Sequence, residues 1–220
     1  GVASSLKTMM MFAFPIAAIV IAMSQSLLTI LNVVYGVASP ILVLLTLDAV
    51  VLLISQFYNS LLFGVERLDE EAKIPLNKLV RSQIFKVFTL PYLQAAIVLP
   101  TGYFVLTRLA VGQPLQAVLY ITAVNMSAHI VTFLGLYGIT HKSVRIVVPW
   151  RTIAKYFLAS AATAIAIYLL AHPTTILLSL ITAISGLATY AALLLAIDRE
   201  ARKLVAAIWH EIKEIFTGSR

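Results

Sequence analysis

Apolar residues fill six long stretches of the chain, and short polar segments separate them. The stretches cover about 8–31, 38–63, 84–107, 115–138, 152–171 and 175–197. A helix needs about 20 mainly apolar residues to cross the hydrocarbon core of a bilayer, because each residue adds about 1.5 Å to its length. The stretches lack the strict alternation of barrel strands. The pattern therefore predicts an all-α polytopic membrane protein, a bundle of about six transmembrane helices.

The last polar segment, residues 199–220, has a different pattern. Leu204, Ile208, Ile212 and Ile215 recur at helical spacing, and charged residues fill much of the remainder. This arrangement is typical of an amphipathic helix that lies on a membrane surface, and a solvated helical tail is the alternative. We therefore expect a six-helix transmembrane lobe over residues 1–198, followed by a cytoplasmic interfacial helix over residues 199–220.

Composition supports the membrane assignment, and charge orients the predicted bundle. Hydrophobic residues make up 61% of the chain, whereas soluble domains are about 45–50% apolar. Of the 16 Lys and Arg residues, all but Arg108 fall in segments on one side of the bundle. Positive charge accumulates in cytoplasmic loops of membrane proteins. The chain is therefore expected to be a multi-pass protein of the cell membrane with both termini in the cytoplasm.

Motifs of soluble enzymes are absent from the sequence. The chain has no cysteine, which excludes thiol catalysis, disulfides and zinc-finger sites. It contains no phosphate-binding glycine loop, and His210 lacks a second histidine four positions later. The net charge of +7 follows from the topological bias, and a nucleic-acid partner would need a basic soluble domain. We expect a protein that is not an enzyme and has no cofactor, no metal and no nucleic-acid partner.

Polar side chains inside the spans are the candidate pathway residues. They are Gln25, Thr29 and Asn32 in the first span, Asp48, Ser55 and Asn59 in the second, and Asn125 in the fourth. The first three share one helix face, and the next three fall within about 20° of one line. Gln94 and His129 add further polar groups near mid-depth. Lining of a cavity and hydrogen bonding between helices are the alternatives for the amides.

Asp48 is the acidic residue inside a predicted span. A carboxylate near the bilayer centre costs about 2.5–3.5 kcal/mol on insertion scales, so something must compensate it. It could take a proton or face a watery cavity with Ser55 and Asn59, and either state would suit cation coupling or gating. It could also pair with Arg108 at the end of the third span, or form a hydrogen bond to a neighbouring helix.

A helix with Pro15 leads to a short external turn with Tyr35 and Gly36, and a long helix ends at Gly64 before the charged segment 64–81. These features resemble the second half of a polysaccharide flippase of the multidrug/oligosaccharidyl-lipid/polysaccharide exporter superfamily. The segments 141–146 (HKSVRI) and 193–205 (LLLAIDREARKLV) continue the resemblance, which covers nearly the whole chain. It implies one lobe of an alternating-access transporter, with membrane lipid and a lipid-linked glycan as partners.

Such flippases have two six-helix lobes with the substrate cavity between them, and this chain corresponds to the second lobe. The start of the sequence, with Lys7 directly before the first apolar run, favours a fragment. A second subunit in place of the N-terminal lobe is the alternative. Two other functions stay open: a lobe of a cation-coupled small-molecule antiporter of the same superfamily, and a non-transporting anchor or assembly subunit. Asp48 favours the antiporter, and the resemblance favours the flippase.

Overall fold

The computed structural model describes residues 2–65, 82–143, 148–170, 173–198 and 201–202. Its helices are α1 (Val2–Ala22), α2 (Ser24–Leu31), α3 (Ser39–Val65), α5 (Gln83–Phe104), α6 (Pro114–Ser143), α7 (Trp150–Leu170) and α8 (Ile176–Ile197). A 3₁₀ helix, η1 (Val33–Ala38), precedes α3, and a π-helical turn, η3 (Val105–Leu109), follows α5. Six of the described helices are long and apolar enough to cross a membrane. The predicted class, an all-α polytopic membrane protein, is confirmed.

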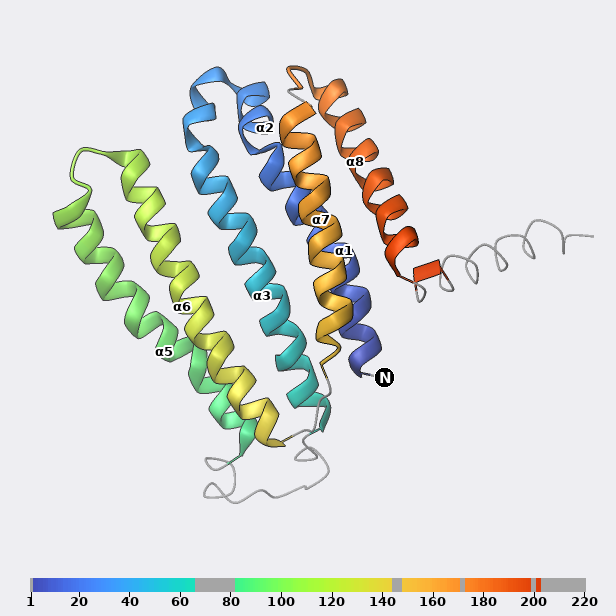
Figure 1. Ribbon diagram of the computed structural model, residues 1–220. Coiled ribbons are helices and arrows are strands. Elements are labelled where there is room, and N and C mark those ends of the chain that lie inside the picture. Colours follow the sequence, from blue (N-terminus) through green and yellow to red (C-terminus); the bar gives the residue numbers. More distant parts are fainter. Residues whose placement is uncertain (1, 66–81, 144–147, 171–172, 199–200, 203–220) are drawn as a thin grey trace, which may run out of the picture.

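The helices form two groups that meet along α1 and α3 (Figure 1). In one group α3 packs against α6, and α6 packs against α5. In the other group α1 packs against α7, and α7 packs against α8. Successive membrane helices run in opposite directions, so η1 and the link between α5 and α6 lie at one end, which we call the upper end from its place in Figure 1. The N-terminus lies at the other, lower end.

The first predicted span, residues 8–31, is two helices rather than one. Helix α1 ends at Ala22 and α2 begins at Ser24, while Met23 between them has φ −99° and ψ 7°. The Oγ atoms of Ser24 and Ser39 lie 2.7 Å apart, and this hydrogen bond ties the start of α2 to the start of α3. Proline residues mark kinks in a sequence, but Met23 is an ordinary helix former and does not predict a break.

Small residues let α8 lie close to its neighbours. A Cβ atom added at Gly186 would lie 2.7 Å from Cδ1 of Ile167 on α7 and 3.3 Å from Cδ1 of Ile19 on α1. Ser160, Thr163, Ser179 and Thr182 of these two helices are buried, and Thr163 and Thr182 donate to carbonyls of their own helices. Self-satisfied hydroxyls and a glycine at the contact are typical of close packing in membranes. The α8 helix therefore packs closely against α7 and α1 at Gly186.

The charge bias holds within the described residues. Cations near the lower end are Lys7, Lys86, Lys142, Arg151, Lys155 and Arg202, whereas Arg108 is at the upper end. The charged segment between α3 and α5 and the predicted amphipathic helix after Arg202 lie outside the described residues. Which end faces the cytoplasm therefore stays a prediction from the positive-inside rule.

Candidate functional site

A carboxylate–imidazole pair joins α3 to α6 inside the bundle. Oδ1 of Asp48 lies 2.7 Å from Nδ1 of His129. The two side chains are 7% and 13% exposed. His129 lies 15 residues after Pro114, the first residue of α6, which places it about 22 Å along a helix of about 45 Å. The pair is therefore an ionisable site in the middle of the membrane-spanning part of the chain.

Helix geometry explains why these two residues meet. Buried residues recur every seven positions on α3, at Ile41, Asp48, Ser55 and Leu62. The same spacing relates Thr122, His129 and Leu136 on α6, where the first and third are buried and His129 is partly buried. A repeat of seven keeps one seam of each helix facing its partner. Since α3 and α6 run in the same direction, one register places Asp48 beside His129.

The pair compensates the charge of Asp48 and can also exchange a proton. With a carboxylate and a neutral imidazole the pair carries one negative charge. One added proton makes it neutral, as imidazolium with carboxylate or as imidazole with carboxylic acid, and the hydrogen bond between Nδ1 and Oδ1 suits both forms. Loss or gain of that proton is thus a change of net charge inside the membrane.

Of the other predicted residues, Ser55 and Asn59 lie on the same helix below Asp48. Ser55 is buried and donates to the carbonyl of Val51, so its hydroxyl is satisfied on its own helix. Asn59 is partly buried, and its Oδ1 is sealed from solvent without a hydrogen-bond partner. Asn125 on α6 is partly buried one turn before His129. The Oδ1 atom of Asn59 can therefore accept a hydrogen bond, on the same helix that carries Asp48.

The polar face of the first span lies apart from this pair, at the upper end. Gln25, Thr29 and Asn32 are exposed. Thr29 donates to the carbonyl of Gln25, and the Asn32 side chain accepts from the backbone N–H of Val34 at the start of η1. Thr29 also lies against Gly36, because a Cβ atom there would be 2.9 Å from its Oγ1. These residues shape the turn between α2 and α3.

Arg108 does not pair with Asp48, so that alternative is not realised. Its side chain is exposed in η3 at the upper end. The acidic groups in the part of the chain that the structure describes are Asp48 and Asp198, and both lie against other partners. Asp198, directly after α8, is buried and accepts from Lys155 at 3.3 Å and from Tyr156 at 3.4 Å. This second cluster fixes the end of α8 to α7.

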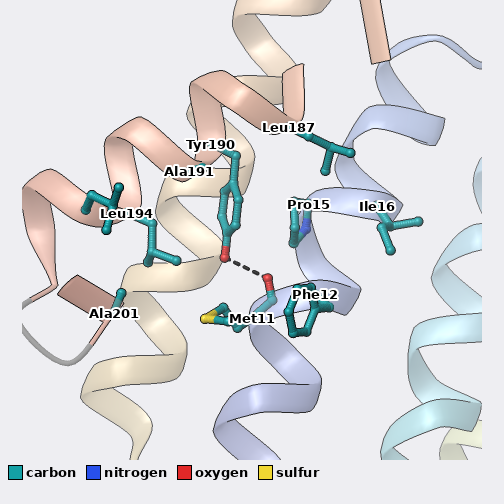
Figure 2. Close-up of a pocket in the computed structure, with 10 residues that line it drawn as sticks. Met11, Phe12, Pro15, Ile16, Leu187, Tyr190, Ala191, Leu194 and Ala201 are labelled. Atoms are coloured by element: carbon teal, nitrogen blue, oxygen red, sulfur yellow. Dashed lines mark hydrogen bonds between the residues drawn. The ribbon is translucent and has the colours of Figure 1, made fainter. Parts of the chain in front are cut away.

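An apolar groove runs between α1 and α8, with a volume of about 420 Å³ (Figure 2). Phe12 and Ile16 on α1 face Leu187 and Ala191 on α8 across it. Proline at position 15 has no N–H, so the carbonyl of Met11 lacks its usual partner within α1. The hydroxyl of Tyr190 donates to that carbonyl at 2.9 Å. The groove therefore has hydrocarbon walls and one interhelical hydrogen bond, to the carbonyl that Pro15 leaves without a partner.

Comparisons of the chain with protein-family models, with curated proteins and with solved structures return no match. Function must therefore be inferred from the membrane fold and its internal polar groups. Among the described residues, no group of three or more His, Asp or Glu side chains is placed to hold a metal ion. The Asp48–His129 pair is the candidate site, and its chemistry is that of proton exchange and charge compensation.

Proposed function

We propose that the chain forms one lobe of an alternating-access flippase for lipid-linked oligosaccharide or polysaccharide precursors. The observation that supports transport, rather than anchoring, is the Asp48–His129 pair at 2.7 Å. Ionisable residues inside membrane spans are costly and commonly belong to ion or substrate pathways. A protein that only anchors a partner to the membrane needs no such pair, because apolar helices alone would hold it in the bilayer.

The choice of a lipid-linked substrate comes from the resemblance of residues 10–73, 141–146 and 193–205 to polysaccharide flippases. The apolar groove between α1 and α8 suits contact with hydrocarbon chains. A second apolar groove of about 430 Å³ lies between α1 and α3, where the two helix groups meet. An N-terminal lobe or a second subunit would complete the transporter and supply the cationic residues that a diphosphate requires.

A cation-coupled small-molecule antiporter is the second candidate. The carboxylate of Asp48 and the imidazole of His129 can bind and release one proton at mid-membrane. Coupling of this kind requires that the protonated and deprotonated pair favour different arrangements of α3 and α6. The same coupling could also drive a flippase, so the two candidates differ in substrate rather than in this pair.

The test uses the complete protein that contains this chain, reconstituted in liposomes. A lipid-linked oligosaccharide with a fluorescent group is placed in both leaflets, and a membrane-impermeant quencher reports movement between them. Empty liposomes are the control. We expect faster loss of fluorescence with the protein than without it, at a rate that depends on pH over about pH 5 to 8. The variant Asp48→Asn, which keeps the shape but removes the charge, is expected to abolish that pH dependence.

Other results separate the alternatives. Movement of a cationic dye driven by a proton gradient, without movement of the glycolipid, would replace the flippase with the antiporter. Neither movement would support an anchor or assembly subunit. Unchanged glycolipid movement with Asp48→Asn at every pH would keep the flippase and reject proton coupling through Asp48.

A further inference from the structure

An open groove of about 590 Å³ lies between α5 and α6, on a different side of α6 from the α3 contact. This volume lies within the range of about 300–1,000 Å³ that is usual for ligand sites. Its walls are apolar apart from Thr101, Ser127 and the Tyr120 phenol. Thr101 donates to the carbonyl of Ile97 and Ser127 to that of Ala123, so their hydroxyls are satisfied within their own helices. The groove therefore presents hydrocarbon along most of its length.

Arg108 lies in η3 at the upper end of α5, where Val105 and Leu109, which both line the groove, flank it in the chain. Ile97, Thr101 and Phe104 line the groove from one stripe of α5. The π-helical turn η3 carries Arg108 and closes with a bond of 3.0 Å from the N–H of Ala110 to the carbonyl of Val105. Such turns are rare and frequently occur at functional sites.

The two ends of the bundle differ in their charged residues. The side chain of Arg108 is exposed, and both acidic residues of the described ranges are engaged elsewhere, with His129 and with Lys155. Arg108 supplies the positive charge of the upper end, since the other described Lys and Arg residues belong to the lower end. Tyr120, six residues after the start of α6, is exposed and lines the same groove. A cation and a phenol thus stand over hydrocarbon walls.

We propose that this groove is a binding site for a membrane phospholipid with an anionic headgroup. One acyl chain lies between α5 and α6, and the phosphate lies on Arg108 in the leaflet at the upper end. The guanidinium matches a phosphate because its N–H groups form a planar fork that can donate two hydrogen bonds at once. Tyrosine is favoured at the headgroup level, where its ring is in hydrocarbon and its hydroxyl is in water. The site does not depend on the transported substrate.

The experiment measures lipid retention on the purified, intact protein by native mass spectrometry. Phosphatidylglycerol and phosphatidylcholine with identical acyl chains are titrated separately, so that only the headgroup charge differs. We expect one phosphatidylglycerol to bind more tightly than phosphatidylcholine. Arg108→Gln should weaken phosphatidylglycerol binding about tenfold, as expected for loss of a charge-assisted hydrogen bond. Arg108→Lys should keep part of the preference, since it retains the charge without the fork.

Two matched controls make the result specific to the groove. Arg151 is an exposed arginine at the lower end, and Arg151→Gln should leave the headgroup preference unchanged. Thr101→Phe would fill the groove and weaken both lipids. Thr89→Phe is its control, because Thr89 is an exposed threonine of α5 outside the groove that also donates to its own helix. Equal effects of the two arginine variants, or of the two threonine variants, would show unspecific lipid contact and overturn the proposal.

Discussion

At the scale of single residues, the hydrogen bond between Asp48 and His129 compensates the carboxylate inside the membrane-spanning part of the chain. Each side chain gives the other a hydrogen-bond partner. Without it, a carboxylate or an imidazole in hydrocarbon would have an unsatisfied polar group, which is costly. The partner of Asp48 is a residue of the adjacent helix at the same depth, rather than the arginine at the end of a span. The energetic link should therefore run between positions 48 and 129.

A double-mutant cycle tests this link. Asp48→Ala and His129→Ala should each destabilise the protein in detergent, and the two effects should overlap by about 1–2 kcal/mol, since interhelical hydrogen bonds in membranes reach about 1.7 kcal/mol. Thermal unfolding of the single and double variants gives the coupling. Arg108→Ala is the control, and its effect should add to that of Asp48→Ala within about 0.5 kcal/mol. Strong coupling to Arg108 would contradict the pairing of Asp48 with His129.

The hydroxyl of Tyr190 on α8 donates to a backbone carbonyl of α1. Tyr190→Phe removes the hydroxyl that donates to Met11 (Figure 2), and we expect it to lower the free energy of unfolding by about 1 kcal/mol. The cost should shrink in a Pro15→Ala background, because an alanine at that position would supply an N–H to the same carbonyl within α1. Unfolding in detergent measures both costs. An undiminished cost in that background would mean that the hydroxyl stabilises the protein by a contact other than the one to the Met11 carbonyl.

At the scale of helices, the contact of α8 with α7 depends on the absence of a side chain at Gly186. Gly186→Ala should destabilise the bundle by about 1 kcal/mol, since its Cβ would approach Ile167 too closely. Combining it with Ile167→Val removes the obstructing Cδ1, so the double variant should be no less stable than Ile167→Val alone. Thermal unfolding measures each.

The matched control for Gly186 is Gly138 on α6, where an added Cβ atom would meet nothing within 4 Å. Gly138→Ala should stabilise by about 0.5–1 kcal/mol, the usual gain from replacing glycine inside a helix. Similar stabilisation by Gly186→Ala would show that α8 can move away from α7 at no cost.

At the scale of the whole molecule, the prediction concerns orientation. Because the chain has no cysteine, each introduced thiol would be the one reactive thiol present. Gln113→Cys in the α5–α6 link should react with an impermeant maleimide added to intact cells, whereas Lys142→Cys near the lower end of α6 should react only after permeabilisation. This follows from the accumulation of cations at the lower end. The reverse labelling pattern would invert the bundle.

The hydrophobic pattern by itself determined the class and the approximate positions of six membrane helices. This is possible because the cost of exposing backbone polar groups to lipid forces each long apolar segment to form a helix. The sequence also singled out Asp48, since a carboxylate inside an apolar run is costly wherever its partner lies. The break at Met23 was not predictable, because it depends on how the start of α2 meets α3 through Ser24 and Ser39.

Only the tertiary structure decided which residues meet. The spacing of seven between Asp48 and Ser55 marks one face of α3, but it says nothing about which helix covers that face. Packing of α3 beside α6 selected His129, a residue 81 positions after Asp48, and left Arg108 exposed in η3 at the upper end. The packing of α7 beside α8 likewise buried Asp198 against Lys155. The hydrophobic effect is not directional, so the apolar pattern identifies each membrane helix but not its neighbours. The neighbours are selected by side-chain shape and by hydrogen bonds between helices.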